Sequence, residues 1–355
     1  MSNRIPVAIL AATGSVGQRF VQLLDSHPLF EVVKLTASDR TVGQKYADAC
    51  HWILPEEMPV WARRMEIQPT NPEKAAIPLA FSALPADAAQ DIEPAFARAG
   101  SLVCSNASAW RTASDVSILL PEVNPDQAEI LTAQRRLRGW SGGIITNSNC
   151  TSTGMTVVLK ALLDVYGLKK VFAVSLQALS GAGYPGVPSV DIIDNVIPLI
   201  KGEEEKIESE PRKMLGHVQG DAIQPADVII SAHANRVAVI DGHMVCLSIE
   251  LDQKGTVESV TKDLRNYQAP EISRDLPSAP HPVIIVRDEL DRPQPRLDRL
   301  TGKGMSTIVG RIRPDALFDI KMVVLSHNTI RGAAGGSIYN AELLVKLGYV
   351  ASGRS

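Results

Sequence analysis

Residues 1–24 place a short apolar segment, a turn of small residues and an amphipathic pattern in immediate succession. Val7–Leu10 is typical of a buried strand, and residues 11–17 lead directly into the helical pattern of residues 20–24. This order is typical of a dinucleotide-binding fold, in which amides at the helix start receive a pyrophosphate. Ala11 replaces one of the usual three glycines, so an ordinary turn of another α/β domain remains an alternative.

Strand and helix patterns alternate from Ile5 to about Thr146, which predicts a mostly parallel sheet with helices on both faces. Ligands of such sheets bind at the carboxyl ends of the strands. The apolar segments 79–82 and 102–105 end at this edge. We therefore expect dinucleotide contacts from the first turn and from the end of segment 79–82, namely from Thr13, Gly14, Ser15, Val16 and Ser82.

The segment after the next predicted strand, Val32–Thr36, bears on the choice between two dinucleotides, because such folds read the adenosine ribose there. Asp39 suits the two ribose hydroxyls of NAD. Ser38 and Arg40 instead provide two donors for the additional phosphate of NADP. We expect NADP to be the cofactor, with Ser38 and Arg40 as phosphate ligands and Asp39 pointing away.

A lone cysteine, Cys150, stands where a helix is predicted to begin. The residues Thr151–Thr153 are good capping residues, an apolar series at helical spacing runs through residues 155–163, and Gly167 is a plausible stop. Free amides and the helix dipole at such a position favour a thiolate and stabilise an oxyanion. We therefore expect a nucleophile, the alternative being an inert buried cysteine.

Length and charge restrict the class of protein. A chain of 355 residues exceeds a typical single domain, so two substantial cores are expected. The net charge of −3 offers no general attraction to nucleic acid or to an acidic membrane. Residues 1–6 lack the apolar core of a signal peptide, and the four cysteines form neither a CxxC pair nor a zinc-ligand pattern. We expect a cytoplasmic protein with reduced thiols and no bound metal.

Beyond Cys150 the pattern changes to a second sheet, interrupted by a polar stretch over residues 201–224. A last helix, from about Gly336 to Leu347, is expected to return to the nucleotide domain. We predict a nucleotide domain over residues 1–150, completed by about 333–355, and a catalytic and dimerisation domain over 151–332. The strands predicted for the second sheet are Val171–Leu179, Val228–His233, Arg236–Ile240, His243–Leu251 and Met322–Ser326.

Eight short motifs occur along nearly the whole chain in an order that resembles the aspartate-semialdehyde dehydrogenase family, in particular its archaeal and fungal type. The resemblance implies a Rossmann-type dinucleotide domain followed by a mixed-sheet α+β domain of the glyceraldehyde-phosphate dehydrogenase type, assembled as homodimers or homotetramers. It also implies the NADPH-dependent reduction of aspartyl 4-phosphate to aspartate semialdehyde, on the route to lysine, threonine and methionine. The motifs are AATGSVGQ, FSALP, SNASAWR, SNCT, QALSGAG, EEEK, RVAVIDGH and RGAAGGS.

The same resemblance implies roles for three residues in the chemistry. Cys150 is the nucleophile that forms a thioester and releases phosphate, and His243 is the acid/base group. Gln177 orients the acyl group or a water. By alternation His243 shares the apolar face of its strand, and we expect it to be exposed at a rim after the turn Asp241-Gly242.

Substrate and nicotinamide contacts are implied in the same way. Arg236 binds the substrate carboxylate, and Glu203 binds the amine, although three successive glutamates leave its register open. Phosphate is held by Arg111, Asn149 and Lys206, and the nicotinamide side is lined by Ser180, Gly181 and Asn328.

Related chemistry on the same scaffold remains open, because a shared fold does not fix the substrate. A reductase of a CoA thioester, of the malonyl-CoA reductase type, and an N-acetyl-glutamyl-phosphate reductase are the alternatives. The set Arg111, Lys206 and Arg236 favours a small phosphate with a carboxylate. A nucleotide-sensing protein without catalysis is a remote alternative, which retention of Cys150 and His243 disfavours.

Overall fold

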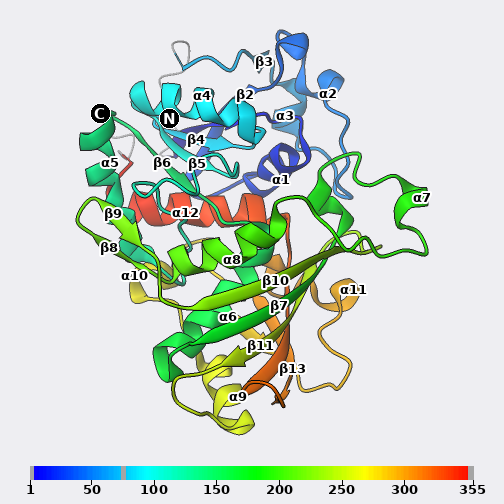
Figure 1. The fold of residues 1–355 in the computed structure, drawn as a ribbon. Coiled ribbons are helices and arrows are strands. Elements are labelled where there is room, and N and C mark those ends of the chain that lie inside the picture. Colours follow the sequence, from blue (N-terminus) through cyan, green and yellow to red (C-terminus); the bar gives the residue numbers. More distant parts are fainter. Residues whose placement is uncertain (1–3, 73–76, 351–355) are drawn as a thin grey trace.

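The computed structural model describes residues 4–72 and 77–350, and within them the strands form two sheets of six strands and one of two (Figure 1). The first sheet is parallel throughout, as the alternation of strand and helix patterns predicts. Its strands, in spatial order, are β3 (Ile67–Gln68), β2 (Phe30–Thr36), β1 (Ile5–Leu10), β4 (Leu79–Ser82), β5 (Leu102–Ser105) and β6 (Gly143–Thr146).

Helices cover both faces of this sheet, which confirms the second part of the prediction. Side chains of β1 alternate between two cores: Ile9 packs in one with Phe20 of α1, and Leu10 packs in the other with Phe96 of α4. Each such buried aromatic side chain contributes about 1.5–3 kcal/mol. The helices and helical turns of this part are α1 (Ser15–Leu23), η1 (Asp39–Thr41), α2 (Tyr46–Ala49), α3 (Val60–Arg64), α4 (Ala86–Arg98), η3 (Pro125–Glu129) and α5 (Ile130–Arg138).

The second sheet is mixed, with β10 parallel to β7 and β11 antiparallel to both β7 and β14. One prediction is wrong: Arg236–Ile240 is not a strand. Arg236 ends β10, and residues 237–240 bond to the loop at 177–180 instead of to a ladder. In spatial order the strands are β10 (Ile229–Arg236), β7 (Lys170–Gln177), β11 (His243–Glu250), β14 (Ile320–Ser326), β13 (Thr307–Pro314) and β12 (Ile284–Val286).

One face of the mixed sheet is covered by α6, and α8 packs against α6 and β10. The stretch at residues 201–224, described from sequence only as polar, contains α8 and a small hairpin. The elements of this part are α6 (Cys150–Tyr166), η4 (Leu179–Ala182), α7 (Ser189–Ile192), α8 (Glu203–Met214), β8 (His217–Gln219), β9 (Ala222–Gln224), α9 (Val257–Asn266), α10 (Glu271–Arg274), α11 (Pro295–Asp298) and η5 (Thr301–Gly304).

The last helix returns to the first sheet, as expected. A π-helical turn, η6 (Ile330–Ala334), leads into α12 (Gly335–Lys346), whose Ile338 and Leu344 belong to the core of Ile9. Figure 1 shows α12, in red, between the two sheets. The division into residues 1–150 with 333–355 and residues 151–332 stays a prediction, and its ends lie partly outside the described residues. No helix in the described ranges is long and apolar enough to cross a membrane.

Candidate active site

Three strands of the mixed sheet bring polar residues to one edge. Gln177 ends β7 and pairs in register with Arg236, which ends the neighbouring parallel strand β10. His243 begins β11, which runs antiparallel to β7 on its other side, so it lies at the same edge. A Cβ added to Gly181 would lie 2.8 Å from a guanidinium nitrogen of Arg236 and 2.9 Å from Nε2 of His243. The loop at Gly181 therefore packs directly against Arg236 and His243.

The nucleophile candidate lies in a cleft of about 420 Å³ at this edge. Cys150 is the first residue of α6, and the helix ends at Gly167, which has φ +71°, as predicted. The cleft brings together residues from both sequence halves, namely Ser15, Val16, Arg111, Asn149, Cys150, Ser180, Gly181, Glu203, Lys206 and Asn328.

The helix cap differs from the prediction. The side-chain oxygen of Asn149 accepts hydrogen bonds from the amides of Thr151, at 2.9 Å, and Ser152, at 3.2 Å. Capping requires a residue of non-helical conformation just before the helix, and Asn149 occupies that position. The prediction that Thr151–Thr153 cap the helix is therefore wrong, because these residues lie inside its first turn.

The surroundings of the Cys150 sulfur act against the expected thiolate. Burial and the nearby carboxylate of Glu203 raise the pKa of the Cys150 thiol to about 12. Arg111 and Arg236 act in the opposite direction but do not outweigh them. The helix start alone does not determine the protonation state, since a carboxylate from another helix faces the same sulfur.

Helix α8 directs one row of charged side chains at the cleft. Glu203 accepts hydrogen bonds from the side-chain amides of Asn149, at 2.8 Å, and Gln177, at 3.2 Å, and pairs with Lys206 at 3.0 Å. Although burial opposes it, Lys206 and these donors lower the pKa of Glu203. The structure thus resolves the register of the three glutamates, since Glu204 bonds to β10 and Glu205 is exposed.

Arg236 and Arg111 are held in place by different hydrogen-bond acceptors. Arg236 donates to the carbonyl of Ala178 at 2.6 Å. Arg111 donates through Nη1 to Glu210 at 3.0 Å and through Nη2 to the carbonyl of Asn106 at 2.8 Å. Among the described residues its buried Nε has no hydrogen-bond partner. Sequence analysis missed Glu210, because a charged helical run does not reveal which carboxylate points inward.

His243 is buried, which contradicts the expected exposure at a rim; only 1% of its surface is exposed, because the loop at Gly181 covers it. Its Nδ1 accepts a hydrogen bond from the amide of Ala178 at 3.0 Å. Burial, together with Arg236 and His327, lowers the pKa of His243 to about 3. The ring is therefore neutral and carries its proton on Nε2, which finds no partner in the described part of the chain.

The residues predicted to contact a dinucleotide fall into two groups. Asn328 donates to the hydroxyl of Ser180 at 2.7 Å and accepts from the amide of Gly242 at 2.8 Å, which fixes one wall of the cleft. Ser15, Val16, Ser180 and Gly181 also line the cleft, whereas five of the predicted residues do not. Ser82 is buried below Asn106, Thr13 and Gly14 lie in the turn before α1, and Ser38 and Arg40 are exposed after β2.

The turn before α1 fits a dinucleotide. Ala11 adopts a left-handed conformation, φ +58°, at the position where this turn usually has glycine. A Cβ at Gly17 would lie 2.3 Å from the carbonyl oxygen of Ala11, so only glycine allows α1 to approach the strand this closely. The first-turn amides of α1, including those of Ser15 and Val16, have no acceptor within the helix and face the cleft side.

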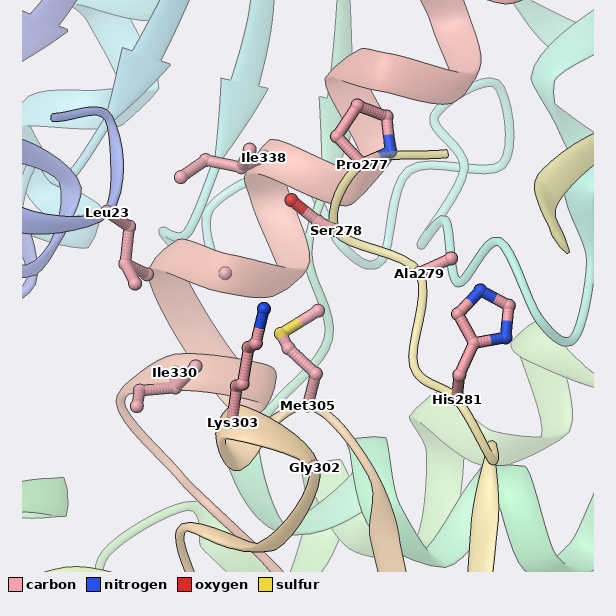
Figure 2. Close-up of a pocket in the computed structure, with 11 residues that line it drawn as sticks. Leu23, Pro277, Ser278, Ala279, His281, Gly302, Lys303, Met305, Ile330 and Ile338 are labelled. Carbon is pink, nitrogen blue, oxygen red and sulfur yellow. The ribbon is translucent and has the colours of Figure 1, made fainter. Parts of the chain in front are cut away.

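The turn η6 separates this cleft from another cavity. Gly332 and Ala333 line the cleft, whereas Ile330 lines a cavity of about 360 Å³ together with Leu23 and Ile338 (Figure 2). No predicted site residue lines that second cavity, so it is not the candidate active site. Within the described residues, no group of three or more His, Cys, Asp or Glu is arranged to hold a metal ion.

Comparison with known proteins agrees with this geometry. Residues 6–131 match the family model described as "Semialdehyde dehydrogenase, NAD binding domain", and residues 159–331 match "Semialdehyde dehydrogenase, dimerisation domain". The fold is thus that of a two-domain semialdehyde dehydrogenase, which confirms the predicted fold class.

Individual relatives show which semialdehyde dehydrogenases the chain resembles in sequence and structure. The aspartate-semialdehyde dehydrogenase of Archaeoglobus fulgidus is 50% identical over 97% of this chain and 98% of its own length. The aspartate-semialdehyde dehydrogenase of Schizosaccharomyces pombe is 45% identical over 96% of this chain and 98% of its own length. A crystal structure of aspartate semialdehyde dehydrogenase with NADP from Candida albicans superposes with a TM-score of 0.90 at 41% identity, covering 98% of this chain and all of that one. The chain belongs to the aspartate-semialdehyde dehydrogenase family.

Proposed function

We propose that this protein reduces L-aspartyl 4-phosphate to L-aspartate 4-semialdehyde with NADPH, releasing phosphate. The observation that carries the proposal is one thiol, Cys150, in a cleft that Arg111 and Lys206 line and close enough to Arg236 for that guanidinium to lower its pKa. Such a site suits a small molecule with a carboxylate at one end and a phosphate at the other. The names of the relatives support the same substrate.

The covalent step belongs to Cys150. Its sulfur attacks the acyl carbon, the bond to the phosphate oxygen breaks, and the thiol proton leaves with phosphate, which gives a thioester. When bound, NADPH supplies the hydride for reduction of that thioester. Because Nδ1 of His243 accepts from Ala178, Nε2 is the atom through which the ring passes one proton from solvent to the resulting oxyanion, so that the ring ends neutral again. Collapse of the hemithioacetal then releases the aldehyde and restores the thiol.

The remaining residues hold the substrate. In this proposal Arg236 binds the α-carboxylate, and Arg111, Asn149 and Lys206 bind the phosphate. Glu203 faces the amine. Gln177, which bonds to Glu203, orients the acyl group beside the sulfur.

NADP would be held by the turn before α1 and by the loops on the other side of the cleft. Ser38 and Arg40 are proposed to bind the ribose phosphate, and the Candida albicans relative described with NADP supports that cofactor. The other proposed contacts are Thr13, Gly14, Ser15, Val16, Ser82, Ser180, Gly181 and Asn328.

We further propose that the protein assembles as a homodimer or homotetramer and is located in the cytoplasm. The face of the mixed sheet opposite α6 exposes apolar side chains, including Phe172 and Ile229. Exposed apolar sheet faces suit a second copy of the chain, and the family model over residues 159–331 is named for dimerisation.

The decisive assay follows the absorbance of NADPH formed from NADP and aspartate semialdehyde, with and without phosphate. We expect formation that depends on phosphate. Parallel reactions contain NADPH with malonyl-CoA or with N-acetyl-glutamyl phosphate. Faster turnover of either of these than of the aspartyl substrate would replace the proposal with the corresponding reductase.

A further inference from the structure

Glu210 has no role in the proposed reaction, yet its carboxylate makes two hydrogen bonds beside the cleft. One carboxylate oxygen accepts from Nη1 of Arg111 at 3.0 Å, and the other accepts from the backbone amide of Asn149. The carboxylate is 5% exposed. A single buried side chain therefore ties the proposed phosphate arginine to the residue immediately before Cys150.

The same face of α8 holds the Arg111 segment a second time. Lys213, which lies three residues after Glu210 in the same helix, donates to the carbonyls of Arg111, at 2.7 Å, and Ala113, at 2.6 Å. Burial lowers the pKa of Lys213 to about 8. Glu210 thus fixes the guanidinium of Arg111 while Lys213 fixes its backbone, and α8 acts as a rigid support for both.

Asn149 is fixed by hydrogen bonds of its backbone amide and of both polar atoms of its side chain. Its amide donates to Glu210, its side-chain nitrogen donates to Glu203, and its side-chain oxygen caps α6. The position of the Cys150 sulfur follows from this residue, because the helix starts there. Movement of α8 would therefore move Arg111 and Cys150 together.

We infer that Glu210 is a positioning residue that sets the distance between the phosphate-binding guanidinium and the nucleophile. This inference rests on the proposed function. Glu210 accepts from Nη1 of Arg111 and the carbonyl of Asn106 accepts from Nη2, so both ends of the guanidinium are held in place. A phosphate then meets a preorganised cation at a fixed distance from the sulfur, and such preorganisation governs both binding and the rate of attack.

The test compares Glu210→Gln with the wild type. Glutamine offers one carbonyl oxygen and one amide nitrogen, so it accepts from either Arg111 or Asn149 and turns a donor toward the other. We expect the KM for phosphate to rise about tenfold or more and kcat to fall about tenfold, because small misplacements of reacting groups cost that much or more. The KM for aspartate semialdehyde and the Kd for NADP should change less than about twofold.

Two further variants separate the effect of the geometry of the Glu210 side chain from the effect of its charge. Glu205→Gln removes the same charge from an exposed position of the same helix and should match the wild type. Glu210→Asp keeps the charge but is too short to reach both donors, so it should also raise the KM for phosphate. Wild-type kinetics in Glu210→Asp would overturn the positional role and leave only a requirement for charge.

Three other outcomes count against the inference. A lower kcat with both KM values unchanged indicates loss of folded enzyme, and equal rises in both KM values indicate general disruption. Wild-type kinetics in Glu210→Gln would likewise overturn the inference while the proposed function stands. If the wild type forms no NADPH in the presence of phosphate, the proposed function itself has failed.

Discussion

Gly332 lies directly against Cys150: a Cβ at position 332 would be 2.8 Å from the Cβ of Cys150 and 2.9 Å from its Cα. The π-helical turn η6 brings about this contact, because Ala333 leaves the helical conformation, with φ −146° and ψ −107°. Such turns are frequent at functional sites. Even one methyl group at residue 332 would have to displace the nucleophile.

Gly332→Ala should therefore lower kcat by about tenfold or more, since displacement of the sulfur reduces productive attack. Steady-state kinetics together with a thermal melt measure this effect. Ala333→Gly, in the same turn, removes a methyl group instead of adding one and serves as the control, which should stay within about threefold of wild type. Full activity in Gly332→Ala would mean that the turn moves freely.

The pH dependence of thiol reactivity tests the electrostatics of the cleft. Burial and Glu203 raise the pKa of Cys150 to about 12, so the reactive thiolate is a small fraction near neutral pH. In the free enzyme, alkylation of Cys150 by iodoacetamide should accelerate about tenfold per unit between about pH 7 and pH 9. Peptide mapping separates Cys150 from the exposed thiol of Cys246.

Glu203→Gln should shift that alkylation profile to lower pH. The substitution removes the negative charge that raises the thiol pKa, whereas Arg111 and Arg236, which lower it, remain. The exposed Glu205→Gln again provides the control. A plateau below about pH 8 in the wild type, or no shift in Glu203→Gln, would contradict this assignment.

Cofactor choice is tested by Arg40→Ala. If Ser38 and Arg40 bind the ribose phosphate, the Kd for NADP should rise about tenfold or more while the Kd for NAD changes little, because the lost bonds are charge-assisted. Fluorescence titration measures both constants. Equal weakening of the two cofactors would indicate that Asp39 governs the choice.

The assignment of the two anion sites is tested by Arg236→Lys. Lysine keeps the charge but loses the paired geometry of the guanidinium, so the KM for aspartate semialdehyde should rise about tenfold and kcat should fall. The KM for phosphate should stay within about twofold, because Arg111 and Lys206 are assigned to that end. Loss of phosphate binding instead would mean that the two sites have been exchanged.

Local patterns were sufficient to predict much of the fold. The strand and helix at residues 7–24, the parallel sheet, the helix that begins at Cys150 and the return of α12 all follow from short-range periodicity. Two strands of the mixed sheet, β12 and β13, were not predicted, and there is a physical reason for each. β12 has three residues, and β13 carries Gly310 and Arg311 in its middle, so neither shows a clear alternation.

Properties that depend on tertiary contacts could not be predicted in the same way. The pKa of Cys150 is raised by burial and by Glu203, which is 53 positions away in sequence and comes near the thiol only when α8 packs on α6. The burial of His243 results from the loop at Gly181. Glu210 stands in a charged run, where sequence gives no sign of which carboxylate turns inward.

The central claim is that an aspartyl thioester forms on Cys150, and mass spectrometry tests it directly. The enzyme is mixed with NADP and aspartate semialdehyde without phosphate, quenched rapidly and digested. We predict one added aspartyl group on the peptide that carries Cys150, its disappearance when phosphate is added before quenching, and its absence in Cys150→Ala, which should still bind NADP. An adduct on another residue, or turnover by Cys150→Ala above about a tenth of the wild-type rate, would contradict the claim.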